Sequence, residues 1–323
     1  MQICSENSDA AGAVADLFSG HKFSVTDCET HTVRAQSVDV QHTEGVIKFN
    51  SFEADMLQRS KESVTAALSS SAKTVISKQD DATPNPTVSK AVWKDASMFN
   101  HSCLSNCNWF TIGDFMVVLA EQDIKEGEEL TVSYIDSLSS YAKRQDNCRS
   151  LGFCCKCERC LREARTSREI QPLLDELASI KGHLPLKMSE HILISRLESL
   201  AARFEKIIPP PSVDVWQTLI LLSNVCQANK AKLKAAETLA QALKSLCSPG
   251  SDSIVPVISS PELPMLAFTA ARFFYNLRRI SDGNLWRAVG KDCALQFFCK
   301  NEELIKYFYS EIEIVREMTD FFD

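Results

Sequence analysis

The second half of the chain contains long stretches in which apolar residues recur every three to four positions. Two such faces hold Ile170, Leu173, Leu174, Leu177 and Ile180, and then Leu193, Leu197, Leu200, Phe204 and Ile207. This period predicts amphipathic helices, and Pro209-Pro210-Pro211 should end the second one because proline cannot continue a helix. Further helices are expected at 216–228, 233–246, 263–280, 285–298 and 303–322. Antiparallel helices of this length predict a helical-repeat array.

In the first half of the chain, apolar residues recur at shorter intervals and less regularly. Residues 32–40 alternate like a strand, 44–52 favour a short helix, and the apolar run at 115–120 predicts a buried strand after a tight turn at Gly113-Asp114. Residues 59–89 are rich in Ser, Thr, Lys, Asp and Pro, which predicts a disordered insertion. The chain is therefore expected to be α+β, with a mixed part at 1–160 and an all-α part at 161–323.

Composition narrows the class of protein. With 323 residues, 45% of them hydrophobic, the chain has enough apolar mass for two packed domains. A formal charge of -7 without clustered Lys and Arg argues against direct nucleic-acid binding, so a protein or small-molecule partner is expected. No apolar stretch approaches the ~20 residues that span a bilayer, and Met1–Val14 lacks the features of a secretory signal. We therefore expect a cytoplasmic and/or nuclear protein without a membrane partner.

The cysteines carry the first candidate chemistry. An intracellular compartment keeps thiols reduced, so the thirteen cysteines are expected to be free thiols or metal ligands. The run Cys155-x-Cys157-x-x-Cys160 offers three thiolates on a tight loop, and tetrahedral Zn²⁺ needs a fourth ligand from elsewhere. The alternative is a group of reduced surface thiols. Cys154 is an adjacent thiol able to replace a ligand, whereas small apolar fillers or free thiols are expected at Cys107, Cys148, Cys226, Cys247, Cys293 and Cys299.

Two further motifs precede the cysteine run in fixed order. They are Asn100-His101-Ser102-Cys103 and the segment Gly127-Glu128-Glu129-Leu130-Thr131-Val132-Ser133-Tyr134. Taken singly, an Asn-His pair suits a loop and a tyrosine suits a core. The three pieces together resemble the C-terminal half of a SET domain with its post-SET zinc module. That combination is typical of the SET and MYND family of S-adenosylmethionine-dependent protein-lysine methyltransferases, and the resemblance covers about Asn50 to Cys160.

The resemblance implies the ligands of two groups. Zn²⁺ would be held by Cys103 together with Cys155, Cys157 and Cys160. S-adenosylmethionine would contact Asn50 and Asn100, with the Asn100 side chain at the methionine end. The backbone around His101 would hydrogen-bond the adenine edge, which leaves the His101 ring a structural role.

The resemblance also implies a catalytic residue and a lysine channel. The hydroxyl of Tyr134 would lie beside the transferred methyl group, where an oxygen orients the reacting groups without being ionised. Phe153 would stack on the adenine. Phe52 would line the lysine channel, where its ring would attract the lysine ammonium group by a cation–π interaction. Leu151 stands where relatives usually carry a tyrosine of that channel. Core packing is the alternative for each aromatic residue, and Glu128 and Glu129 are expected to be structural.

Two family features are not evident in the chain. The Gly-x-Gly segment that opens a SET domain is missing, since Gly12 and Gly20 lie too far apart, and no MYND finger follows them. The expected fold is therefore a partial SET domain with a post-SET module, followed by a tetratricopeptide-like (TPR-like) helical domain. The leading function is protein-lysine N-methyltransferase with weakened activity. A non-catalytic protein that binds a partner through its helices, and a zinc-stabilised pseudoenzyme that binds the cofactor, are the alternatives.

Overall fold

A computed structural model describes residues 52–53, 90–112, 115–183, 189–248 and 254–309, together with positions 314 and 318. Several predictions concern residues outside these ranges: the strand at 32–40, the insertion at 59–89, the turn at Gly113-Asp114, and Asn50. The helix predicted at 44–52 also lies outside them except for its last residue, where it is wrong. Phe52 belongs to strand β1 (Phe52–Glu53), because its backbone pairs with Ala91 of β2 (Lys90–Ala91).

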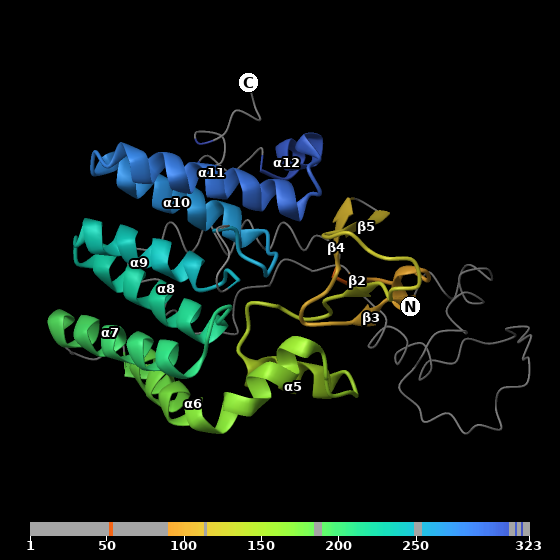
Figure 1. The fold of residues 1–323 in the computed structure, drawn as a ribbon, viewed down its shortest axis with the longest axis horizontal. Helices are drawn as coiled ribbons and strands as arrows, with labels where there is room; N and C mark the ends of the chain where they lie inside the picture. The colour runs from red at the N-terminus through yellow and green to blue at the C-terminus, as the bar shows by residue number, and fades with distance from the viewer. Residues whose placement is uncertain are drawn as a thin grey trace, which may run out of the picture.

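The described strands form three two-stranded sheets on one side of the molecule (Figure 1). β1 and β2 are antiparallel, and a short 3-10 helix, η2 (Ala96–Met98), follows them. β3 (Asn100–His101) pairs in parallel with β6 (Thr131–Val132), although thirty or so residues separate them in the chain. In the segment of chain that joins β3 to β6, β4 (Cys107–Ile112) and β5 (Phe115–Ala120) form a regular antiparallel hairpin.

The predicted strand at 115–120 has the right bounds but the wrong environment. β5 is half-buried along its middle and exposed at both ends, with Phe115 76% exposed, so the strand is not a buried one. The buried strand is β4, which uses both of its faces. Phe110 is fully buried among helical residues, while Trp109 packs toward the small strands and donates its indole N–H to the Ser133 carbonyl at 3.1 Å.

The predicted helices are present, and most of their ends differ by a few residues. The helix predicted at 303–322 is described only from Glu302 to Tyr309, and most of its remainder lies outside the described residues. The observed bounds of the helices are α6 (Glu158–His183), α7 (Glu190–Ile207), α8 (Val213–Ala228), α9 (Lys232–Lys244), α10 (Glu262–Asn276), α11 (Ile280–Phe297) and α12 (Glu302–Tyr309). α7 ends directly before Ile208 and the proline run, as expected. α6 begins earlier than its apolar face indicates, and its first turn includes Cys160. The cysteine motif is therefore only partly a loop.

The helices after α5 (Tyr141–Ser150) stack in chain order (Figure 1). α6 packs on α7, α8 on α9 and α10 on α11, and each pair contacts the next. One apolar core runs through this array from Ile170 to Cys293, with Leu197, Phe204 and Leu243 fully buried. The helical nature of the second half is thus confirmed, and its likeness to TPR repeats stays a prediction. Within the described residues, no helix is both long and apolar enough to span a bilayer.

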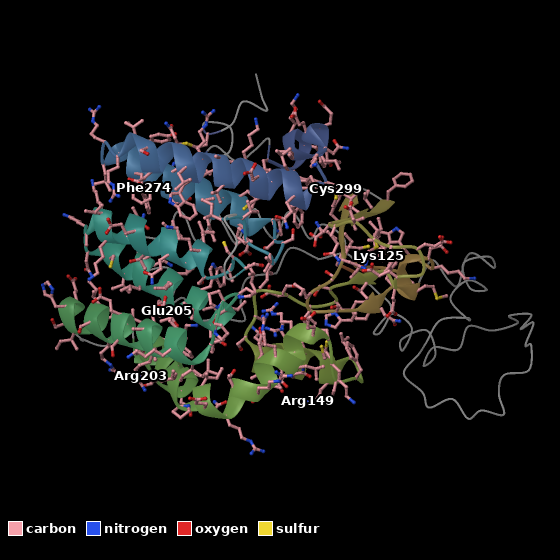
Figure 2. All side chains as sticks on the ribbon, in the orientation of Figure 1. Lys125, Arg149, Arg203, Glu205, Phe274 and Cys299 are labelled. Carbon is pink, nitrogen blue, oxygen red and sulfur yellow. The ribbon has the colours of Figure 1, made fainter. Side chains whose placement is uncertain are left out.

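The helical array supports the strand region directly. The ring of Phe110 meets those of Phe298 and Phe308, with centroids 5.6 and 5.0 Å apart, and Asn108 Nδ2 donates to the Phe297 carbonyl at 3.0 Å. Cys299, just beyond α11, lies beside the strand hairpin (Figure 2). These contacts hold β4, and through it the neighbouring strands, against the ends of α11 and α12.

The close packing of α10 on α11 leads to a stability prediction. A Cβ built on Gly290 would lie 2.5 Å from the ring of Phe268, which is fully buried. We expect Gly290→Ala to destabilise the protein by about 1–3 kcal/mol because the overpacked ring has no free space to enter. Gly182→Ala is the matched control, since that Cβ meets nothing within 4 Å. Chemical denaturation measures both, and an unchanged Gly290→Ala midpoint would contradict the packing.

Candidate functional site

The parallel pairing of β3 with β6 brings the first two sequence motifs side by side. Asn100 faces Thr131 and His101 faces Val132, and the Ser102 N–H donates to the Val132 carbonyl at 3.1 Å. The Asn-His-Ser-Cys run and the segment that ends at Tyr134 are therefore adjacent in space. The sequence order alone does not supply this pairing.

A buried asparagine that the sequence analysis missed holds this pairing in register. Asn106 is 7% exposed; its Oδ1 accepts from the Thr131 N–H and its Nδ2 donates to the Glu129 carbonyl, both at 2.9 Å. Nδ2 also lies 3.3 Å from Glu128 Oε1. One amide side chain thus pairs with this backbone as a neighbouring strand would. Only its position between two recognised motifs marks it in the sequence.

Asn100 already has a partner within the protein. Its Nδ2 donates to Glu129 Oε1 at 2.6 Å, and the contact is exposed to solvent. The neighbouring Glu128 accepts the backbone N–H of Lys125, and this hydrogen bond lowers the pKa of Glu128 below its ordinary value. Both glutamates are therefore engaged in the turn before β6.

The His101 ring links the strand pair to the cysteine cluster. Nδ1 accepts the backbone N–H of Tyr134 at 3.0 Å, so in the neutral ring Nε2 carries the proton. That nitrogen lies 3.2 Å from Cys103 Sγ. Burial is the main cause that lowers the pKa of His101 to about 4, and the ring is accordingly neutral at physiological pH.

Three of the predicted site residues form one aromatic group. The His101 ring centroid lies 5.2 Å from Tyr134 and 5.6 Å from Phe153, and the last two meet edge-on at 6.2 Å. The Tyr134 hydroxyl donates to the Phe99 carbonyl. Burial, and then the charge of Glu129, raise the pKa of Tyr134, so the phenol stays protonated at neutral pH. Its single proton is used, and its oxygen is left as an acceptor.

The structure describes the other predicted cofactor and channel residues only in part. Asn50 lies outside the described residues. Phe52 is placed only by the backbone pairing of β1 with β2. Leu151 caps the C-terminus of α5, where it is half-buried two residues before Phe153.

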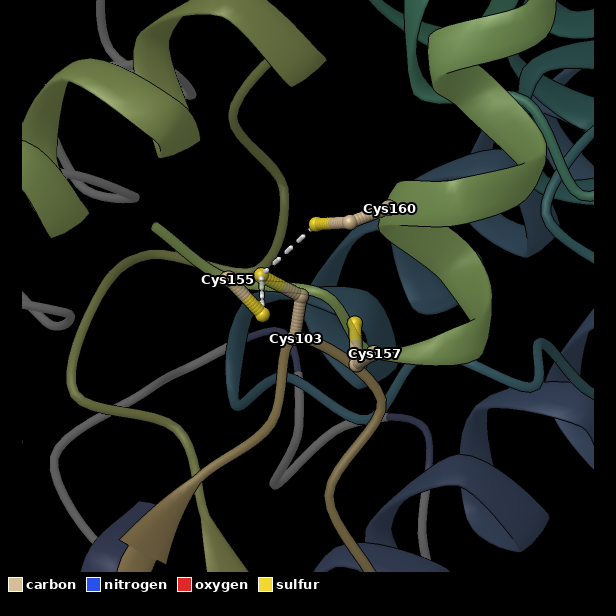
Figure 3. A group of neighbouring side chains, drawn as sticks. All are labelled: Cys103, Cys155, Cys157 and Cys160. Carbon is tan, nitrogen blue, oxygen red and sulfur yellow. Dashed lines mark hydrogen bonds between the residues drawn. The ribbon is translucent and has the colours of Figure 1, made fainter. Parts of the chain in front are cut away.

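Four cysteines from two distant segments form a compact cluster (Figure 3). The sulfurs all lie within 4.8 Å of one another, and Cys103 Sγ is 3.8 Å from Cys155 and 3.6 Å from Cys160. Tetrahedral zinc with Zn–S bonds of about 2.3 Å requires sulfurs about 3.8 Å apart. Cys103, Cys155 and Cys160 are buried and Cys157 is half-buried, so the cluster is not a group of surface thiols.

The ionisation of these thiols also suits a cation. Hydrogen bonds from Cys103 and Cys160 hold the pKa of Cys157 well below its usual range, while donation to Cys157 raises the pKa of Cys103 well above it. One thiolate is therefore stable among its thiol neighbours, and further ionisation needs a nearby positive charge. The residues thus fit a Zn²⁺ ion. Exposed Cys154 lies outside the group, and Cys148 is fully buried behind it.

Comparison with known proteins identifies the strand region. The SET domain family model matches residues 18–135. The chain therefore carries a SET domain. The match begins well before Asn50, so the similarity reaches further toward the N-terminus than the sequence analysis indicated.

Several curated relatives are named as lysine methyltransferases. Human histone-lysine N-methyltransferase SMYD3 is 28% identical over 149 residues, which cover 42% of this chain and 32% of that protein. Human N-lysine methyltransferase SMYD2 is 35% identical over 82 residues, or 25% of this chain and 19% of that protein. Histone-lysine N-methyltransferase SET5 of Eremothecium gossypii is 43% identical over 68 residues, covering 21% and 14%. The matched segment spans no more than a third of these relatives.

Proposed function

We propose that the chain is an S-adenosylmethionine-dependent protein-lysine N-methyltransferase. The observation that carries this proposal is the β3–β6 pairing, which sets Asn100, His101 and Tyr134 within one small region beside Phe153. These are the residues that the SET resemblance assigns to the cofactor and the methyl group. The named relatives act on lysine, and a protein lysine is accordingly the proposed substrate.

Each residue has a role that its surroundings permit. The Asn100 amide and the backbone at His101 would hold the cofactor, and Phe153 would offer an aromatic face to its adenine. When bound, S-adenosylmethionine supplies an electrophilic methyl group. The Tyr134 hydroxyl donates its proton to the Phe99 carbonyl. Its oxygen would therefore accept weak contacts from the methyl group and orient the incoming amine. Phe52 and Leu151 would line the lysine channel, and Asn50 would complete the cofactor contacts.

We also propose that Cys103, Cys155, Cys157 and Cys160 hold one structural Zn²⁺ ion. Four protein thiolates leave no open position on the metal, so the ion would stabilise the fold and take no part in the methyl transfer. Its structural effect would be local. The ion would fix the segment that carries Phe153 against the loop that follows Asn100 and His101.

A non-catalytic interaction protein is the second candidate function. The observation in its favour is that the Asn100 amide is bound by Glu129 and the Tyr134 hydroxyl by Phe99, so both polar groups are satisfied within the protein. In that case the helical array would bind a protein partner and the SET domain would serve as scaffold. The cytoplasmic or nuclear location stays a prediction for either function.

Cofactor binding tests the proposal. The chain has no Gly-x-Gly run, and each backbone group left unpaired around a ligand costs roughly 1–3 kcal/mol. Two such losses weaken binding by a factor of hundreds, since about 1.4 kcal/mol is tenfold. We therefore expect calorimetry to give a Kd for S-adenosylmethionine weaker than micromolar, with slow methylation of peptide lysines.

The two functions differ in this measurement. Saturable binding that Asn100→Ala weakens supports the enzyme, whereas no binding at millimolar cofactor favours the interaction protein. Micromolar or tighter binding would contradict the expected weakness and favour the enzyme over the interaction protein. Glu128→Gln is a suitable control because Glu128 engages the same turn but has no proposed contact with the cofactor.

A further inference from the structure

Two arginines are buried beside the cysteine cluster. Arg144 on α5 and Arg159 on α6 are 0% and 1% exposed, and both pair with the single carboxylate of Glu163. Arg159 Nε donates to Glu163 Oε1 at 2.9 Å, and Arg144 Nη2 donates to Oε2. Burying a charged group is costly, and these two cations share one paired carboxylate. The fold therefore needs a reason to bury both.

The arginines also bond to the backbone around the cluster. Arg159 Nη1 donates to the carbonyl of Cys103 at 3.2 Å and to that of Ser137 at 2.7 Å, and Arg144 Nη1 donates to the carbonyl of Ser139 at 2.6 Å. Two buried donors, Arg144 Nε and Arg159 Nη2, have no hydrogen-bond partner within the described part of the chain. Such groups are rare in buried positions and call for an acceptor or a nearby negative charge.

A metal-loaded cluster would carry negative charge, which could balance the two arginines. Zn²⁺ with four thiolates has a net charge of -2, whereas Arg144, Arg159 and Glu163 together carry +1. Asp214 is also buried and adds one negative charge when ionised, with its pKa raised to about 6 by burial, whereas Lys181 is exposed to solvent. The two guanidinium groups, each with a buried donor left unpaired, therefore complement the negative charge that a loaded cluster would carry.

We infer that Arg144 and Arg159 are positioning residues that compensate the charge of the zinc–thiolate cluster and thereby set its zinc affinity. Glu163 pairs with both guanidinium groups, and its negative charge reduces the positive charge that they offer to the cluster. The inference rests on the zinc site proposed above. It adds that α5 and α6 contribute to metal retention through residues that are not ligands, as outer partners of metal sites commonly do.

Charge substitutions test the inference because they predict opposite signs. Arg159→Met and Arg144→Met should each weaken Zn²⁺ retention about 10–100-fold in competition with a coloured chelator, the usual range for such residues. Glu163→Gln should strengthen retention, since it removes a negative charge and keeps both cations. If the three residues only brace the fold, all three substitutions should loosen Zn²⁺ alike.

Controls separate charge from folding. Arg159→Lys keeps the positive charge and should restore most of the affinity that Arg159→Met loses. Arg203→Met removes an arginine from another ion pair, with Glu176 on the far α6–α7 surface, and should leave retention unchanged (Figure 2). Circular dichroism verifies folding, and Glu163→Gln decides the matter even if an arginine variant does not fold.

The zinc content of the unmodified protein distinguishes the two proposals. If elemental analysis finds no zinc, the zinc site and this inference both fail. If one Zn²⁺ is present but Glu163→Gln weakens its retention or leaves it unchanged, the zinc site stands and the inference is overturned. Tighter retention in Glu163→Gln with looser retention in Arg159→Met supports both.

Discussion

Cys157→Ser is expected to abolish stoichiometric zinc and to disorder the segment from Leu151 to Leu161. Cys157 stands between Cys155 and Cys160, and a serine hydroxyl is a poor replacement for a thiolate ligand. Structural zinc contributes on the order of 10 kcal/mol to folding in small metal-binding segments. Elemental analysis measures the metal, and hydrogen exchange measures the order of the segment.

Cys154→Ser provides the matched control for that experiment. Cys154 is exposed and lies outside the cluster, so the same change at the adjacent thiol should leave zinc and hydrogen exchange unaltered. The helices from α7 onward should keep their protection in both variants, because their core contains none of the four cysteines. A Cys157→Ser protein that retains one equivalent of zinc would contradict the proposed ligand set.

Periodicity predicts the helical half well because burial there follows a single rule. α7 turns one apolar face to its neighbours, with Leu197, Leu200 and Phe204 buried, and the spacing of those residues reveals both the element and its core side. α8 is apolar and buried almost all round, which also marks a helix of the core. The end of α7 was also predictable, since the proline run follows Ile207 directly. The start of α6 was not, because its first turns are charged and its cysteines indicated a loop.

The parts that the sequence did not predict depend on polar side chains that are buried. α5 has no apolar stripe; instead it buries Arg144 and Gln145. Asn106 and Arg159 would ordinarily be assigned to the surface, and they are buried because their hydrogen bonds are met by distant backbone groups. Such partners are separated by up to fifty-six residues, as for Arg159 and Cys103, and no local pattern announces them.

The candidate site, too, was only partly predictable from the sequence. The SET resemblance implied which residues gather, and the structure brings together the four cysteines and the group of His101, Tyr134 and Phe153. The means of assembly had no sequence signal. They are the parallel pairing of two-residue strands and the Asn106 side chain that keeps it in register.

Tyr134→Phe should lower kcat on the order of 100-fold while leaving the Kd for S-adenosylmethionine nearly unchanged. The tyrosine oxygen is placed by its hydrogen bond to Phe99, and its proposed action is on the geometry of methyl transfer. Losing a group that acts mainly in the transition state lowers kcat more than binding, and single polar groups of this kind contribute about 10²–10³ in rate. Single-turnover methylation and calorimetry measure the two quantities.

Asn100→Ala should give the reverse pattern and separates a working site from a structural one. Its amide is proposed to hold the cofactor, so the Kd should rise before the rate at saturating cofactor falls. The substitution also frees Glu129, which is exposed at that contact, so little stability should be lost. Tyr134→Phe leaves the Phe99 carbonyl without its donor, at a cost of about 1 kcal/mol that thermal unfolding would detect.

If both variants change rate and binding equally and slightly, Tyr134 is a core tyrosine and Asn100 a loop asparagine. The SET domain would then be a scaffold for the helices.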